Sequence, residues 1–144
     1  METVKFFASL GIVAGYGHDN IMKTTKTPEE ITGEVWQKKA AEVMAETKSE
    51  KNPNGVYVGA VIARAKTVYH TDWGCPVGGE DTVLLTGEAN PKFTAIGPYG
   101  LDFREAVRKV LSRTAQALGQ TTTQLTFLDA EFEYFEFQPE EKAK

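Results

Sequence analysis

Six stretches of the chain show the spacing of apolar residues that is typical of a strand or a helix. The first, from Val4 to Ala14, is apolar at neighbouring positions, as in a strand covered on both faces. Apolar residues recur at helical spacing over residues 28–47 and again from Asp102 to Leu118. Strands are predicted at three further places, which are residues 56–70, 82–89 and 123–137.

Capping residues mark the ends of the predicted helices. Glu30 lies three residues after Thr27, which is the spacing of a capping box at a helix N-terminus. Asp102 and Glu105 repeat that pattern at the second helix. Gly119 follows the second helix in the position where a glycine commonly ends one.

The order β-α-β-β-α-β predicts an α+β fold, the ferredoxin-like sandwich, in which a four-stranded antiparallel sheet carries two helices on one face. We expect one domain over residues 1–138 and a charged, disordered tail over residues 139–144. The order resembles that of many ferredoxin-like oligomers, small tautomerases among them. Those tautomerases use an N-terminal proline, whereas Glu2 follows Met1 here, so the resemblance implies a fold and no function.

One face of such a sheet carries no helix. The first, second and last predicted strands have apolar residues at both odd and even positions, so the exposed apolar area would be large. We expect a second copy of the chain to cover this face in a dimer or trimer, with coverage by long loops as the alternative. In the last strand the apolar parity changes twice, which predicts bulges or two halves that face different surfaces.

Composition narrows the class of protein. The 144 residues carry a formal net charge of −4 and a single cysteine, which cannot form an intrachain disulfide. Lysines and arginines are not clustered as nucleic-acid binding requires, so we expect no nucleic-acid partner. No stretch approaches the roughly 20 apolar residues of a membrane span, and the N-terminus lacks the basic region of a signal peptide. We therefore expect a cytoplasmic protein without a membrane partner.

Two polar loops are predicted to meet at one end of the sheet, because the first and second strands run parallel. One loop follows the first strand, and the other covers residues 71–81. With His70, the residue just before the second loop, they hold both histidines and the only cysteine of the chain. Aromatic surfaces and polar groups of this kind suit the binding of a small polar molecule. The residues that we expect to contact such a ligand are Tyr16, His18, Asp19, Asp72, Trp73 and Glu80.

Three functions are compatible with these loops. The first is binding of a small ligand or ion, since no catalytic motif is recognisable. The second is an enzyme in which the Cys75 thiolate is the nucleophile and His70 or His18 is the base. The third is a structural oligomer in which the loops make only subunit contacts. Metal-binding residue types are present (His18, His70, Asp72, Cys75 and Glu80), but no pair has a compact ligand spacing, so no metal or cofactor is assigned.

Overall fold

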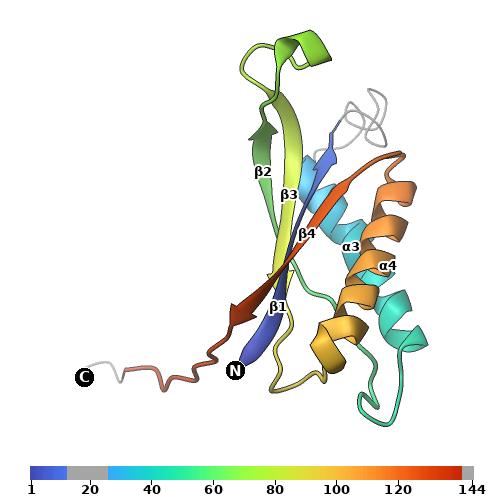
Figure 1. The fold of residues 1–144 in the computed structure, drawn as a ribbon, viewed down its shortest axis with the longest axis vertical. Helices are drawn as coiled ribbons and strands as arrows, with labels where there is room; N and C mark the ends of the chain where they lie inside the picture. The colour runs from blue at the N-terminus through green and yellow to red at the C-terminus, as the bar shows by residue number, and fades with distance from the viewer. Residues whose placement is uncertain (13–25, 141–144) are drawn as a thin grey trace.

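The computed structural model describes residues 1–12 and 26–140. Its elements in chain order are β1 (Glu2–Gly11), α3 (Pro28–Glu46), β2 (Val61–Thr67), the 3-10 helix η1 (Thr71–Trp73), β3 (Glu80–Glu88), the 3-10 helix η2 (Pro98–Gly100), α4 (Leu101–Ala117) and β4 (Gln124–Glu131). The strands form one sheet in the order β2-β3-β1-β4, and each neighbouring pair is antiparallel. The predicted fold is confirmed, and Figure 1 shows α3 and α4 on the same side of the sheet.

The hydrophobic core lies between the sheet and the two long helices. Alternate residues of β1 face it and are buried: Val4, Phe6, Ala8 and Leu10. The Phe6 ring stacks on Trp36 of α3 at 6.0 Å and lies 6.3 Å from the ring of Phe103 on α4. One strand residue therefore joins both helices to the sheet. In the part of the chain that is described, no helix has the length and apolar character needed to span a membrane.

Two of the three predicted helix caps are confirmed. Thr27 accepts a hydrogen bond from the backbone N–H of Glu30 at 3.2 Å, as predicted. Gly119 has a φ of +72° and follows α4, also as predicted. The capping box predicted for the second helix is wrong, because Gly100 precedes α4 in a left-handed conformation and makes no side-chain cap. A side chain there would collide with Val4, so only glycine fits this close approach.

The second strand is shorter than predicted and begins at Val61. Val56 and Val58 before it are buried, but their backbone groups bond to α3 and its C-terminal end. The Val58 carbonyl accepts a hydrogen bond from the Trp36 indole at 2.8 Å, and the Val56 N–H donates to the Thr47 hydroxyl at 2.7 Å. The alternation of apolar residues therefore extends from β2 into the preceding segment, which packs against α3 and is not part of the strand.

The last strand is also shorter than predicted, and it contains no bulge. Its register with β1 is continuous from the Ser9–Gln124 pair to the Glu2–Glu131 pair. The change of parity has a simpler cause, since Phe127 packs against the core while Leu128 is 50% exposed. β4 ends at Glu131, opposite Glu2 of β1, and the backbones of Met1 and Phe132 exchange hydrogen bonds just beyond this pair.

The register places the loop between β2 and β3 at the same end of the sheet as the end of β1. Thr67 pairs with Glu80 at the mouth of this loop, and Gly11 pairs with Thr82. We name residues 68–79 the hairpin loop; Figure 1 shows it projecting beyond the sheet. The other predicted loop, with Tyr16, His18 and Asp19, lies outside the described residues, so the meeting of the two loops stays a prediction.

Candidate functional site

Short-range hydrogen bonds shape the tip of the hairpin loop. The His70 ring accepts a hydrogen bond from the backbone N–H of Asp72 through Nδ1 at 3.0 Å and so caps η1. The same ring lies 5.6 Å from that of Trp73, and Gly74 closes the turn with a φ of +100°. The Trp73 side chain is nevertheless 78% exposed. The loop thus presents a flat aromatic surface to solvent from an ordered turn.

Tyr69 and Glu80 interact where the hairpin loop joins the sheet. Thr67 pairs with Glu80, and Tyr69 follows two residues later, which strand alternation places on the same side. Partial burial raises the pKa of Tyr69, and the negative charges of Glu80 and Cys75 and a hydrogen bond with Glu80 raise it further. The Tyr69 hydroxyl is therefore protonated at neutral pH and is a hydrogen-bond donor.

Tyr69 is the residue of this site that the sequence reasoning missed. A titratable group whose pKa is shifted by a specific charged neighbour is a typical feature of a functional site. Strand alternation places Tyr69 on the same side as Glu80 once Thr67 is known to pair with Glu80. The sequence alone does not supply that pairing, so it could not indicate Tyr69.

Cys75 and His70, the proposed nucleophile and base, make contacts with different groups. The Cys75 side chain is 5% exposed, and its sulfur lies 3.3 Å from the carbonyl oxygen of Pro76 and 3.8 Å from that of Thr67. The His70 ring contacts Asp72 and Trp73 instead. Residues 1–12 and 26–140 include no group of three His, Cys, Asp or Glu side chains that could hold a metal ion. The Cys75 mechanism stays a hypothesis.

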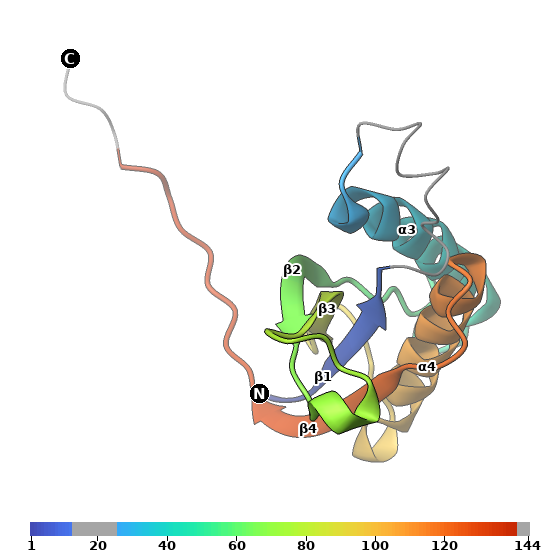
Figure 2. The ribbon, with the colours of Figure 1, turned by 90° about the horizontal axis from the view of Figure 1, so that it is seen from above.

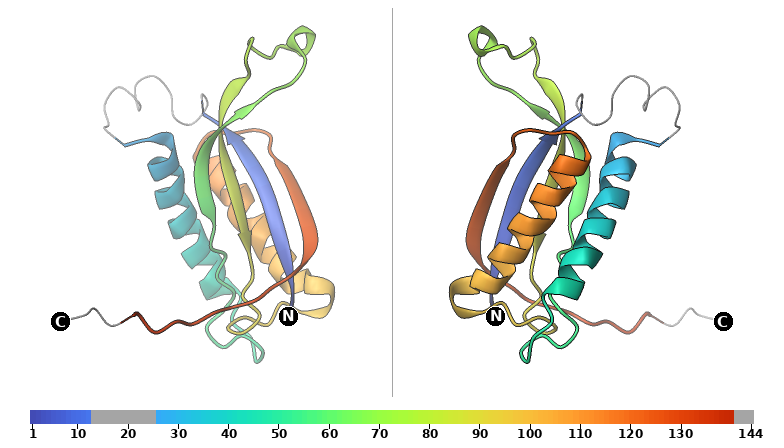
Figure 3. Two further views of the ribbon diagram at one scale, coloured as in Figure 1. Left: turned by 90° about the vertical axis from the view of Figure 1, so that its left-hand side faces the viewer. Right: turned by 90° about the vertical axis from the view of Figure 1, so that its right-hand side faces the viewer.

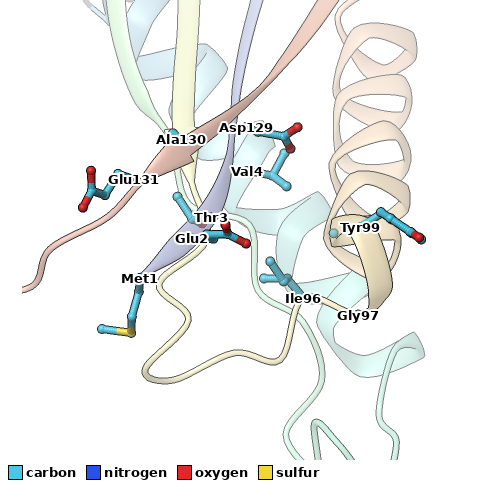
Figure 4. A pocket seen from close by; sticks show the side chains of 11 residues that line it. Met1, Glu2, Thr3, Val4, Ile96, Gly97, Tyr99, Asp129, Ala130 and Glu131 are labelled. Atoms are coloured by element: carbon cyan, nitrogen blue, oxygen red, sulfur yellow. The ribbon is translucent and has the colours of Figure 1, made fainter.

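A cavity of about 700 Å³ lies at the opposite end of the sheet (Figure 4). It is bordered by the start of β1, the end of β4 and η2, and it includes the carboxylates of Glu2, Asp129 and Glu131. Asp129 is already paired with Arg104 of α4 at 2.9 Å. None of the residues predicted from the sequence lines this cavity. Its lining comes from three segments that are far apart in the chain, so no local motif marks it.

The family to which the chain is related is clear from sequence comparison. The family profile described as SAM lyase matches residues 1–136, which include every strand and helix of the described fold. The chain belongs to the SAM lyase family. Searches of curated proteins and of solved structures found no match. Because a lyase is an enzyme, membership of the SAM lyase family supports a small-molecule enzyme, which was the second of the three functions considered from the sequence.

Proposed function

We propose that this member of the SAM lyase family cleaves S-adenosylmethionine, the molecule that the family name abbreviates, at the hairpin loop. The residues that would act there are Tyr69, Trp73 and Glu80, which we name the hairpin site. The observation that carries this assignment is geometric: the Thr67–Glu80 pairing places Tyr69 and Glu80 on the same side of a hairpin that also presents the 78% exposed Trp73. The large cavity offers carboxylates, but Asp129 there is neutralised by Arg104.

The hairpin site suits the chemical groups of S-adenosylmethionine. The substrate carries a permanent positive charge on sulfur and a second one on its ammonium group. The exposed Glu80 carboxylate would attract these charges, and the Tyr69 ring can contact a cation through its face. Trp73, 78% exposed, offers a surface on which the adenine ring can stack.

A lyase on this substrate breaks a carbon–sulfur bond without adding water. When the bond from sulfur to the γ-carbon of the methionine portion breaks, the electron pair stays on sulfur and gives neutral 5′-methylthioadenosine. The remaining carbon chain either loses a proton from the neighbouring carbon and becomes an alkene, or is closed to a lactone by its own carboxylate. Tyr69 is protonated and so positions the substrate as a donor, whereas Glu80 would take the proton in the first route. Both routes release 5′-methylthioadenosine.

The test is to incubate the purified full chain with S-adenosylmethionine and to measure 5′-methylthioadenosine by liquid chromatography and mass spectrometry. We expect the wild-type chain to release it, and Tyr69→Phe to lower kcat/KM by about 10- to 100-fold, because a hydrogen-bond donor in the site is lost. Tyr57→Phe is the matched control, since Tyr57 lies before β2 and outside the hairpin site. No product from the wild-type chain, or equal losses in both variants, would overturn the proposal.

A further pair of variants separates the hairpin site from the large cavity. Trp73→Ala should raise KM with a smaller effect on kcat, because stacking contributes to substrate binding. Glu2→Gln alters a carboxylate of the cavity and should leave both constants unchanged. If Glu2→Gln abolishes activity while the Trp73 and Tyr69 variants retain it, the reaction takes place in the cavity.

A further inference from the structure

The last described stretch of the chain, residues 132–140, lies outside the strands and helices, and we name it the C-terminal arm. Only its first residue, Phe132, still exchanges backbone hydrogen bonds with Met1. Its aromatic side chains are exposed: Tyr134 is 43% exposed, Phe135 63% and Phe137 82%. The rings of Phe135 and Phe137 stack on each other with centroids 6.0 Å apart. Apolar rings gathered on an exposed segment are a feature of interaction surfaces.

Contacts with the loop after β3 hold the arm near its root. Lys92 Nζ lies 3.0 Å from Glu136 Oε1 and 5.0 Å from the centre of the Tyr134 ring. Phe93 meets the Tyr134 ring edge to face at 5.6 Å. From this root the arm extends away from the body, on the side of the sheet opposite the helices (Figures 1 and 2). The arm therefore leaves its own sheet rather than covering it.

The helix-free face of the sheet is a second surface that no described helix covers (Figure 3, left), and exposed apolar side chains lie on it among polar ones such as Lys5 and Glu88. Alternate positions of the four strands contribute its side chains. Val61 is 68% exposed there, Leu128 50% and Leu84 37%. The apolar residues that we assign to this face are Phe7, Val61, Ala63, Leu84 and Leu128.

We propose that the C-terminal arm packs across the helix-free face of a second copy of this chain. Beyond the Lys92–Glu136 ion pair the arm has four described residues, which at ~3.3 Å per residue reach about 13 Å, and four strands ~4.8 Å apart make a face roughly 15–20 Å wide. The free end of the arm therefore reaches across most of the face of a neighbour. Such an exchange removes both apolar surfaces from water, although a single chain leaves them exposed. The partner is thus another copy of the same chain, and each copy can give an arm and receive one.

Sedimentation of the full chain at micromolar concentration tests whether the arm holds copies together. The combined change Phe135→Ser and Phe137→Ser should weaken association by about 100-fold or more, since burial of each phenylalanine contributes roughly tenfold or more. Leu84→Asp, on the receiving face, should have a comparable effect. Leu101→Ser is the control, because Leu101 is 54% exposed but lies on α4 in the helix layer. A monomeric wild-type chain, or assembly unchanged in the arm variant, would overturn the proposal.

A photo-crosslink tests where the arm binds. Phe137 is replaced by p-benzoylphenylalanine, and this protein is mixed with isotopically labelled wild-type chain before irradiation. We expect crosslinks between labelled and unlabelled chains at Phe7, Val61, Leu84 or Leu128, or at their immediate neighbours on the face. Crosslinks confined to one chain would show that the arm folds back on its own subunit. Crosslinks to the helices or the β2 edge of another copy would show that it binds a different surface, and either result refutes the assignment.

Discussion

The hydrogen bond from Trp36 to Val58 carries a stability prediction that can be worked out from the structure. Trp36 is 3% exposed and Val58 is fully buried, and the indole N–H lies 2.8 Å from the Val58 carbonyl oxygen. Trp36→Phe removes the donor and leaves that carbonyl without a partner, at a cost of about 1–3 kcal/mol. The smaller ring also loses core contacts beside Phe6, worth roughly 1 kcal/mol. The expected total is about 2–4 kcal/mol.

Thermal and urea unfolding followed by circular dichroism measure this cost. For a chain of this size, a loss of about 2–4 kcal/mol lowers the Tm by roughly 6–12 °C. The chain supplies its own control, since Trp73→Phe changes an exposed ring and should shift stability by less than ~0.5 kcal/mol. Equal and small effects of the two variants would refute the claim that Trp36 holds the segment before β2 against α3.

Three further outcomes are expected. Gly87→Ala should destabilise the fold by about 1–3 kcal/mol in urea unfolding, because its methyl group would lie 2.5 Å from the Gly59 carbonyl oxygen; an unchanged midpoint would contradict this. Cys75→Ser should keep kcat/KM within about threefold of wild type, whereas a loss of ~1000-fold or more would restore the nucleophile hypothesis. The pKa of Tyr69 is raised in the folded state, so its contribution to stability is fully present below the ordinary tyrosine pKa and is lost as pH rises through the folded value. Alkaline unfolding of Tyr69→Phe should lack that component; identical profiles for the variant and the wild-type chain would contradict it.

The order of elements could be predicted because it depends on local patterns. Helical spacing and the Thr27–Glu30 cap predicted a first helix over residues 28–47, and the observed α3 ends one residue earlier, at Glu46. Strand ends were missed because they depend on distant partners. The last strand stops at Glu131, opposite Glu2, and this end is set by the register with β1 at the other end of the chain. Likewise, the Val58 carbonyl accepts a hydrogen bond from the Trp36 indole on α3 instead of bonding within the sheet. No sequence pattern near Val58 indicates this.

The candidate site could be placed in part. The unusual composition of residues 69–81 indicated the hairpin loop, and Trp73 and Glu80 were named from it. Tyr69 was not, because its interaction with Glu80 depends on the register of the hairpin and on partial burial of the hydroxyl. The family could not be predicted, since no short motif in this chain identifies a lyase; the family profile over residues 1–136 shows it.

The most direct measurement is kcat/KM for 5′-methylthioadenosine release by Glu80→Gln and Glu88→Gln. Both residues lie on β3 at positions of the same parity, Glu80 at the hairpin loop and Glu88 at the far end beside Lys5, 3.4 Å away. If Glu80 binds the positively charged substrate, Glu80→Gln should lower kcat/KM by about 100-fold while Glu88→Gln stays within about twofold of wild type. Equal values for the two variants would contradict the assignment of the reaction to the hairpin site.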